Sequence, residues 1–145
     1  MSTRNKIYTI VIITTMFLLS SCQGQRSTKV IQVIDGDTVI IENGYHVRYI
    51  GIDAPEKGEA YYLESTLLNK KLVEGKSIRL EKDISEKDKY GRILGYVYVD
   101  NVFVNAEIVR FGYAHAKAYP PDIKHQWYLE TIEAEAKKTK RGIWK

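Results

Sequence analysis

The sequence has 145 residues, of which 44% are hydrophobic and 28% charged, so it has the length and composition of one globular domain and is not collagen-like or of low complexity. The lysines and arginines number 22 against 18 aspartates and glutamates, and this net charge of +4 permits binding to a polyanion without demonstrating it. The single cysteine excludes a disulfide within the chain, and with three histidines it makes a structural zinc site unexpected. Stability must therefore come from a hydrophobic core.

Residues 1–21 have the pattern of an export signal. Arg4 and Lys6 precede an uncharged, mostly apolar run over residues 7–19, and small residues follow it. As a helix this run would cover about 20 Å, which is less than the ~30 Å hydrocarbon core of a membrane. We therefore expect a signal peptide that is removed rather than a permanent transmembrane helix.

The end of this segment, Leu19-Ser20-Ser21-Cys22, has the order of a lipobox. The sequence thus resembles a bacterial lipoprotein precursor, which is cleaved before Cys22 and carries lipid on its sulfur. The alternative is an ordinary signal peptide followed by an incidental cysteine. In the lipoprotein interpretation the protein is extracytoplasmic and is anchored to a bacterial membrane in the cell envelope.

The remaining chain divides into residues 22–29, a short polar and lipidated tether, and residues 30–145, the folded domain. Removal of Arg4 and Lys6 with the signal peptide leaves a net charge of only +2. Any affinity for a polyanion must then come from a local cluster of cations.

Turn signals divide the first part of the domain into strands. Asp35-Gly36-Asp37 interrupts a run of β-branched residues, and Asn43-Gly44 is the strongest short signal for a hairpin. The strands predicted around these turns cover residues 30–35, 38–42 and 45–52. They form a three-stranded meander.

A helix is predicted next, over residues 59–74, because apolar side chains recur there at helical spacing and Gly75 follows as a cap. Its expected buried face consists of Ala60, Leu63, Leu67, Leu68, Leu72 and Val73. The later predicted elements are strands over residues 77–83 and 92–99 and helices over residues 104–111 and 123–140. This order predicts an α+β, mainly β protein: a five-stranded OB-fold barrel with three helices.

Carboxylates gather in the two turns that flank the predicted hairpin. They are Asp35, Asp37, Asp53 and Glu56, and pairing of the two hairpin strands brings them to one end of the barrel. Carboxylates so placed repel one another unless a cation lies among them, and Ca²⁺ is the natural hard cation for oxygen ligands. Spacing alone leaves equally open that these residues only form turns and end a strand.

Two arginines strengthen the interpretation as a catalytic site. Arg48 lies in mid-strand and points to the face opposite Val47 and Tyr49, so its guanidinium needs an anionic partner. Arg92 begins a later strand. Two arginines beside several acids favour phosphoryl chemistry because paired N–H donors match phosphate oxygens, although either arginine alone is more often part of a surface ion pair.

Five groups of residues, in order, resemble motifs of the staphylococcal nuclease (thermonuclease) family. They are Ile34-Asp35-Gly36-Asp37-Thr38, the stretch Val47-Arg48-Tyr49-Ile50-Gly51-Ile52-Asp53-Ala54-Pro55-Glu56, Asp88-Lys89-Tyr90-Gly91-Arg92, Val104-Asn105 with Phe111-Gly112, and Gly142-Ile143-Trp144. The resemblance extends from Val30 to Trp144. It implies a Ca²⁺-dependent phosphodiesterase on an OB-fold, an endonuclease that cleaves DNA and RNA and leaves 3′-phosphates. We expect a monomer.

The resemblance also implies a metal site. Asp37, Asp53 and the backbone carbonyl of Ala54 match its Ca²⁺ ligands, with water completing the coordination, and Asp35 lies behind them without binding the ion. Position 54 is threonine in the founding member of the family, and alanine leaves this main-chain ligand intact.

Catalytic roles follow from the same resemblance. Glu56 matches the general base that takes a proton from the attacking water, and Arg48 and Arg92 match the arginines that hold the scissile phosphate. Lys89 and Tyr90 match a pair that contacts the terminal phosphate of the nucleotide. The loop after Glu56 is shorter than in the founding member, which affects rate and substrate preference rather than the type of reaction.

The rival interpretation is a non-catalytic OB-type module that binds single-stranded nucleic acid. Such a module predicts the loss of acids or arginines, and none of those named above is lost. A Ca²⁺-binding adhesion domain would leave Arg48 and Arg92 without a role.

Overall fold

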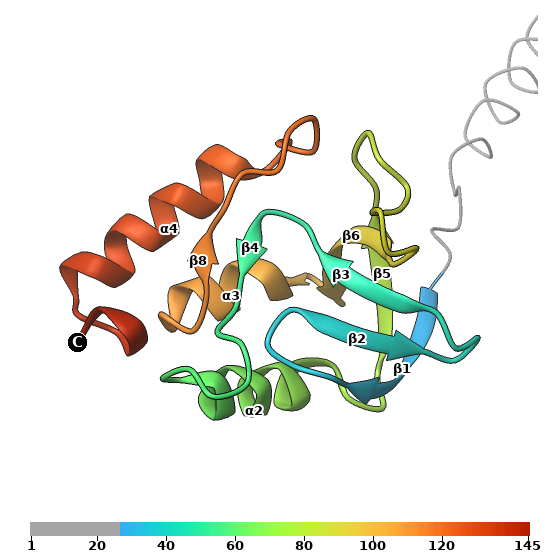
Figure 1. Ribbon diagram of the computed structural model, residues 1–145, viewed down its shortest axis with the longest axis horizontal. Coiled ribbons are helices and arrows are strands. Elements are labelled where there is room, and N and C mark those ends of the chain that lie inside the picture. The colour runs from blue at the N-terminus through green and yellow to red at the C-terminus, as the bar shows by residue number, and fades with distance from the viewer. Residues whose placement is uncertain (1–26) are drawn as a thin grey trace, which may run out of the picture.

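The structure is a computed structural model that describes residues 27–145, so the expected signal peptide, Cys22 and most of the expected tether lie outside it. The strands are β1 (Ser27–Val33), β2 (Thr38–Ile41), β3 (His46–Tyr49), β4 (Ile52–Asp53), β5 (Ser77–Glu81), β6 (Ile93–Val99), β7 (Val102–Phe103) and β8 (His115–Ala116). The helices are α2 (Tyr62–Val73), α3 (Val104–Arg110) and α4 (Gln126–Lys138), followed by the 3₁₀ turn η2 (Gly142–Trp144) (Figure 1). Over this range, none of the helices combines the length and apolarity needed to span a membrane.

Five of the strands close into a barrel. Their order is β3-β2-β1-β5-β6, with β7 added at the edge of β6. Neighbours in this order are antiparallel, and the parallel pairing of β3 with β6 closes the barrel. The predicted class and the OB-fold barrel with three helices are confirmed.

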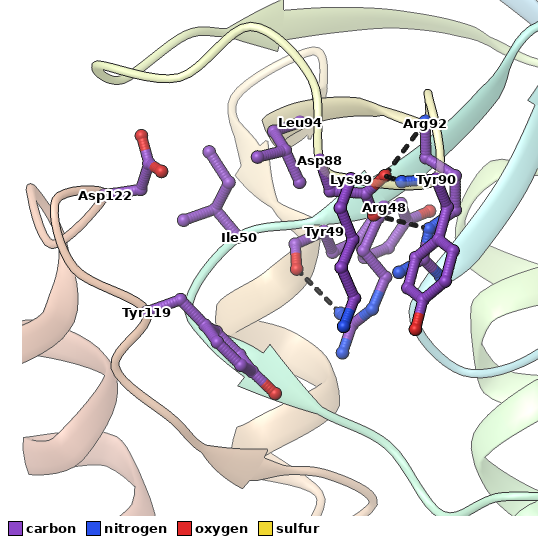
Figure 2. A pocket seen from close by; sticks show the side chains of 10 residues that line it. All are labelled: Arg48, Tyr49, Ile50, Asp88, Lys89, Tyr90, Arg92, Leu94, Tyr119 and Asp122. Carbon is purple, nitrogen blue, oxygen red and sulfur yellow. Dashed lines mark hydrogen bonds and ion pairs between the residues drawn. The ribbon is translucent and has the colours of Figure 1, made fainter.

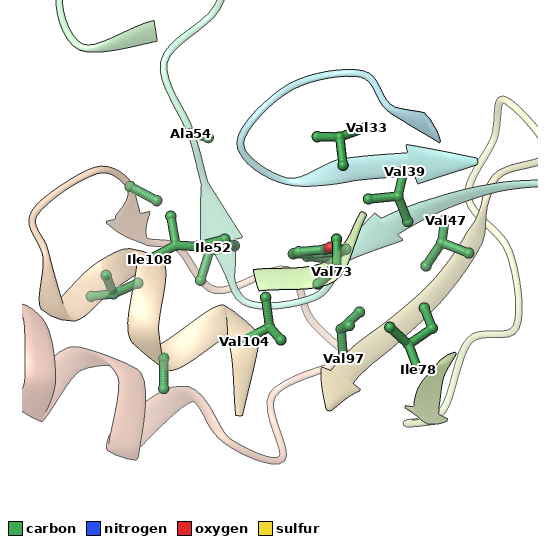
Figure 3. Packing of buried hydrophobic residues seen from close by; sticks show 14 of the residues in the cluster. Val33, Val39, Val47, Ile52, Ala54, Val73, Ile78, Val97, Val104 and Ile108 are labelled. Carbon is green, nitrogen blue, oxygen red and sulfur yellow. The ribbon is translucent and has the colours of Figure 1, made fainter. Parts of the chain in front are cut away.

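The barrel encloses one core. Aliphatic side chains from its strands, from α2 and from α3 fill it, as Figure 3 shows for Val33, Val39, Val47, Val73, Ile78, Val97 and Val104. All of these side chains are 5% exposed or less. This core joins the barrel strands to α2 and α3.

The third predicted strand is shorter than expected, and the break shapes the site. β3 ends at Tyr49, and the N–H of Ile50 donates to the carbonyl of Gly95 at 3.0 Å. Gly51 then adopts a φ of +79°, in the left-handed region that glycine favours, and β4 leaves the barrel to pair with β8. Asp53 therefore lies outside the barrel, in the short sheet that β4 forms with β8.

The expected buried face of α2 is partly wrong: Val73 is buried and Leu68 and Leu72 pack against the core as expected, but Ala60 is exposed. Leu63 and Leu67 are 61% and 54% exposed, whereas the buried side chains are Ser65, Thr66, Asn69 and Val73. The turn at Gly36 comes so close to the helix that a Cβ there would lie 1.8 Å from the Ser65 hydroxyl oxygen. Only small or hydrogen-bonding side chains fit this contact, and Leu63 and Leu67 turn outward.

Candidate active site

The centre of the candidate site is an arginine between two carboxylates. The Nη2 atom of Arg48 lies 3.1 Å from Oδ2 of Asp37 and 3.1 Å from Oδ1 of Asp53. Its Nη1 atom donates to the carbonyls of Tyr49 at 2.8 Å and Ile52 at 3.0 Å. The side chain is only 12% exposed. The break after β3 thus supplies most of the acceptors that fix this guanidinium.

Asp37 is a buried acid with strong local hydrogen bonds. Its Oδ2 accepts the N–H of Ala54 at 2.7 Å, and its own N–H donates to Oδ1 of Asp35 at 3.0 Å. Burial raises the pKa of Asp37 to about 7; Arg48 opposes this rise and the negative charge of Asp35 adds to it. The guanidinium of Arg48, which is shared with Asp53, therefore does not offset the effect of burial on Asp37.

The buried polar face of α2 supports the acidic turn. Asn69 is fully buried; its Nδ2 donates to the carbonyl of Asp35 at 2.8 Å, and its Oδ1 accepts the hydroxyl of Tyr49 at 2.9 Å. Asn69 therefore joins the helix, the Asp35–Asp37 turn and β3 in one network. Sequence analysis missed this residue because the helical pattern drew attention to the leucines.

A pocket of about 450 Å³ lies beside Arg48. Its lining residues are Arg48, Tyr49, Ile50, Asp88, Lys89, Tyr90, Arg92, Leu94, Tyr119 and Asp122. Figure 2 shows Arg48, Lys89, Tyr90 and Arg92 gathered on one side, with Tyr119 across from them. Three cationic side chains and three tyrosines at one pocket suit a ligand that carries both phosphate and planar bases.

The second turn of the site holds Arg92. Asp88 accepts the N–H groups of Tyr90 at 2.9 Å and Arg92 at 3.1 Å, and its Oδ2 accepts Nε of Arg92 at 2.7 Å. Burial acts to raise the pKa of Asp88, but these hydrogen bonds outweigh it and lower the pKa. The ammonium of Lys89 lies 5.0 Å from the centre of the Tyr90 ring. Contacts within the turn itself thus hold the side chains of Arg92 and Lys89 in place.

A family model described as Staphylococcal nuclease homologue matches residues 46–145. The chain belongs to this family. It is 36% identical to a thermonuclease of Staphylococcus hyicus, with 83% of this chain and 76% of that protein covered. It is 38% identical to a thermonuclease of Staphylococcus intermedius, with coverage of 78% and 73%, and to an uncharacterized endonuclease of Escherichia coli, with coverage of 80% and 75%. These similarities support a nuclease activity.

In this staphylococcal nuclease homologue, all but one of the predicted site residues lie near Arg48 or line its pocket, and Glu56 is the exception. Asp35, Asp37, Asp53 and Ala54 lie around Arg48, and Arg92, Lys89 and Tyr90 share the pocket with it. Glu56 is exposed and does not line the pocket. Among residues 27–145 its carboxylate has no hydrogen-bond or ion-pair partner, while its backbone N–H donates to Oε2 of Glu59 at 2.7 Å.

Two further residues at the site carried no sequence signal. Lys117 lies with its ammonium 2.7 Å from Oδ2 of Asp53 and 5.4 Å from the centre of the Tyr119 ring. The hydrogen bond to Asp53 is the main cause of a raised pKa of Lys117. Sequence analysis gave Tyr119 no role. Lys117 and Asp53 are 64 residues apart, and only the pairing of β4 with β8 brings them together.

The acidic cluster fits a hard cation. In the described part of the chain, no three His, Cys, Asp or Glu side chains converge as a metal site, so an ion here would take few protein ligands. Asp37 and Asp53 nevertheless face the same Arg48 nitrogen, and burial, with a smaller effect of the Asp35 charge, raises the pKa of Asp37 in spite of Arg48. Oxygen-only donors suit Ca²⁺ or Mg²⁺ rather than softer metals.

Proposed function

We propose that the protein is a Ca²⁺-dependent endonuclease that hydrolyses phosphodiester bonds of DNA and RNA and leaves 3′-phosphates. The observation that carries the proposal is the position of Arg48. This side chain contacts Asp37 and Asp53 and also lines the pocket that contains Arg92. A phosphodiester in the pocket would meet the guanidinium groups on one side and the acidic cluster at the other.

In this proposal, Asp37 and Asp53, with the backbone carbonyl of Ala54, would hold Ca²⁺. The bound ion would supply a Lewis acid that polarises the phosphate and lowers the pKa of the attacking water. Asp35 would keep the ligand turn in place through its hydrogen bond with the N–H of Asp37.

Arg48 and Arg92 would bind the phosphate and stabilise the charge that develops on its oxygens. Arg48 suits this task because two backbone carbonyls already fix Nη1 of its guanidinium. A donor that is fixed before reaction needs no reorganisation when charge develops. Lys89 and Tyr90 would contact a terminal phosphate of the nucleotide, and Tyr119 offers an aromatic face to a base.

Glu56 would take the proton from the attacking water. The new bond between the water oxygen and phosphorus forms as the bond to the 5′ oxygen breaks, and the leaving oxygen takes a proton from solvent. Because the Glu56 carboxylate has no partner within residues 27–145, it is not neutralised by a neighbouring cation. Glu56→Gln should lower turnover by about 10²-fold or more and leave substrate binding nearly unchanged. Normal turnover in Glu56→Gln would assign the base to another group.

The activity is tested with purified residues 23–145. Single- and double-stranded DNA and RNA are incubated with Ca²⁺, with Mg²⁺ or with chelator, and the ends of the products are examined. We expect cleavage with Ca²⁺, little turnover with Mg²⁺, and ends that polymerase extends only after phosphatase treatment. Full activity in chelator contradicts the metal assignment. Retained binding of single strands without cleavage in any metal would favour the non-catalytic binding module.

We also propose that Cys22 carries lipid and anchors the protein outside the cytoplasm. The support is the Leu19-Ser20-Ser21-Cys22 sequence after an apolar run. Cells given a fatty-acid analogue should label the wild-type protein and not Cys22→Ser, and the wild-type protein should sediment with membranes, because two or three acyl chains anchor stably. Unlabelled wild-type protein in the soluble fraction would make the cysteine incidental.

A further inference from the structure

Large apolar side chains are exposed at one end of the barrel. Ile84, in the loop between β5 and β6, is 72% exposed; Ile123, in the loop before α4, is 50% exposed, and Trp127, in the first turn of α4, is 78% exposed. We call these three residues the apolar tip. Exposed tryptophan and isoleucine at one place on a small domain indicate a surface that contacts something else.

Hydrogen bonds hold the two loops of the apolar tip together. The N–H of Ser85 donates to Oδ1 of Asp122 at 2.7 Å, and the N–H of Lys124 donates to Oδ2 of Asp83 at 2.9 Å. The residues on either side of Ile84 and of Ile123 are therefore joined directly. Hydrogen bonds therefore fix the two loops of the tip to each other.

The N-terminal end of the described chain lies at the same end of the barrel. Ser27 pairs with Arg79, close to the point where β5 enters the loop that carries Ile84. In Figure 1 this loop, the loop before α4 and the start of α4 lie at the top of the view, and α2 lies at the bottom. Cys22 precedes Ser27 by five residues, which span at most about 18 Å. A lipid on Cys22 would keep this end near the bilayer.

The two lysines that directly flank the tip are paired with acids. Lys82 is paired with Glu86 at 2.6 Å, and Lys124 is paired with Glu81. These two pairs leave little free positive charge at the tip itself, since Lys87 and Lys89, further along the same loop, lie over the Tyr45 ring and at the pocket. Tryptophan and isoleucine, in contrast, partition readily into the interfacial region of a bilayer.

We infer that the apolar tip inserts shallowly into the bilayer when the chain is anchored through Cys22, and so orients the nuclease domain on the membrane. The inference rests on the proposed lipid anchor. A contact of three side chains is weak by itself, but tethering makes the second contact intramolecular and raises its effective concentration.

The test attaches residues 22–145 to phosphatidylcholine vesicles that contain a maleimide lipid. Cys22 is the only cysteine of the sequence, so this coupling anchors the protein whether or not cells add lipid. In Trp144→Phe, Trp127 is the one remaining tryptophan. On vesicles its emission should shift to the blue, and iodide quenching should fall at least about twofold relative to the uncoupled protein.

A matched reporter on α2 gives the control. Leu67 is 54% exposed at the opposite end, so the variant Leu67→Trp/Trp127→Phe/Trp144→Phe should remain equally quenchable on and off vesicles. Ile84→Glu, added to Trp144→Phe, should abolish the protection of Trp127 on vesicles without changing the far-UV spectrum of the fold.

Three outcomes would overturn the inference. They are equal quenching of Trp127 on and off vesicles, protection of the Leu67→Trp reporter instead, and protection of Trp127 by polynucleotide in the absence of vesicles. Missing fatty-acid labelling in cells would count against the anchor alone, because the coupled protein still reports on docking. Loss of nuclease activity would likewise leave the fluorescence result unaffected.

Discussion

The two turns of the candidate site use similar hydrogen bonds at very different depths. Asp35 accepts the N–H of Asp37, and Asp88 accepts the N–H groups of Tyr90 and Arg92. The first turn packs against α2, where a Cβ on its central glycine would collide with Ser65, whereas the second has open space around its glycine. The same turn chemistry is therefore enforced by tertiary packing in one case and by local bonds in the other.

The pKa values of the acids in the two turns shift in opposite directions because the turns are buried to different depths. Burial raises the pKa of Asp37 to about 7, while the hydrogen bonds from Arg92 and the backbone lower the pKa of Asp88 in spite of burial. Burial thus disfavours the charged form of the acid in the inner turn unless a cation lies beside it, whereas the acid of the outer turn is already paired with its own arginine. This contrast suits the first turn to bind a metal and the second to present a cation to substrate.

The largest expected effect separates the two arginines. Arg48→Lys keeps the charge but loses the paired donors, so turnover should fall by the equivalent of about 3 to 4 kcal/mol. Stability should fall as well, because Arg48 has four acceptors around its buried guanidinium. Arg92→Lys should lower turnover and leave the unfolding midpoint nearly unchanged. Kinetics and thermal unfolding of both variants check this, and normal turnover in folded Arg48→Lys would contradict the proposed role.

Alanine at the two glycines tests packing against local strain. Gly36→Ala should cost about 3 kcal/mol of unfolding free energy, since its Cβ meets Ser65 and Ala54. Gly91→Ala meets nothing within 4 Å and bears only the cost of its φ of +81°, about 1 kcal/mol. Urea unfolding measures both variants. If Gly91→Ala were the more destabilised, packing against α2 would not distinguish the turns.

Asn69→Ala tests the support of the buried turn. The change leaves the buried hydroxyl of Tyr49 without its acceptor and the carbonyl of Asp35 without its donor, which should cost about 2 kcal/mol of unfolding free energy. Leu67→Ala, on the exposed face of the same helix, should change stability by less than about 0.5 kcal/mol. Equal losses of unfolding free energy in the two variants would indicate that Leu67 is as buried as Asn69 and would contradict the structure.

The smallest expected effect is a pH dependence at the outer turn. The folded pKa of Asp88 lies below its ordinary value of 3.8, so its contribution to stability is present above that value and is lost as pH falls through the lower, folded value. Asp88→Asn should therefore be slightly less stable than the wild type at pH 7 and equally stable near pH 2. Chemical unfolding at a series of pH values tests this, and a gap that widens in acid would contradict it.

Short sequence patterns predicted much of this fold. Asn43-Gly44 predicted the hairpin, and Gly44 indeed adopts a φ of +80° between β2 and β3. Gly75 ends α2 with a φ of +71°. The position of Arg48 opposite the core face of β3 also followed from alternation alone. Each of these features depends on residues close together in the chain, so a short stretch of sequence contains its cause.

Other features depend on partners far away in the chain. The break at Gly51 follows from the pairing of β4 with β8, and the buried face of α2 follows from its contact with the Gly36 turn. Sequence by itself determined the order of strands and helices, the family motifs and the acids and arginines of the site. Only the tertiary structure decided that Lys117 and Asn69 join that site, because long-range packing brings them to Asp53 and Asp35.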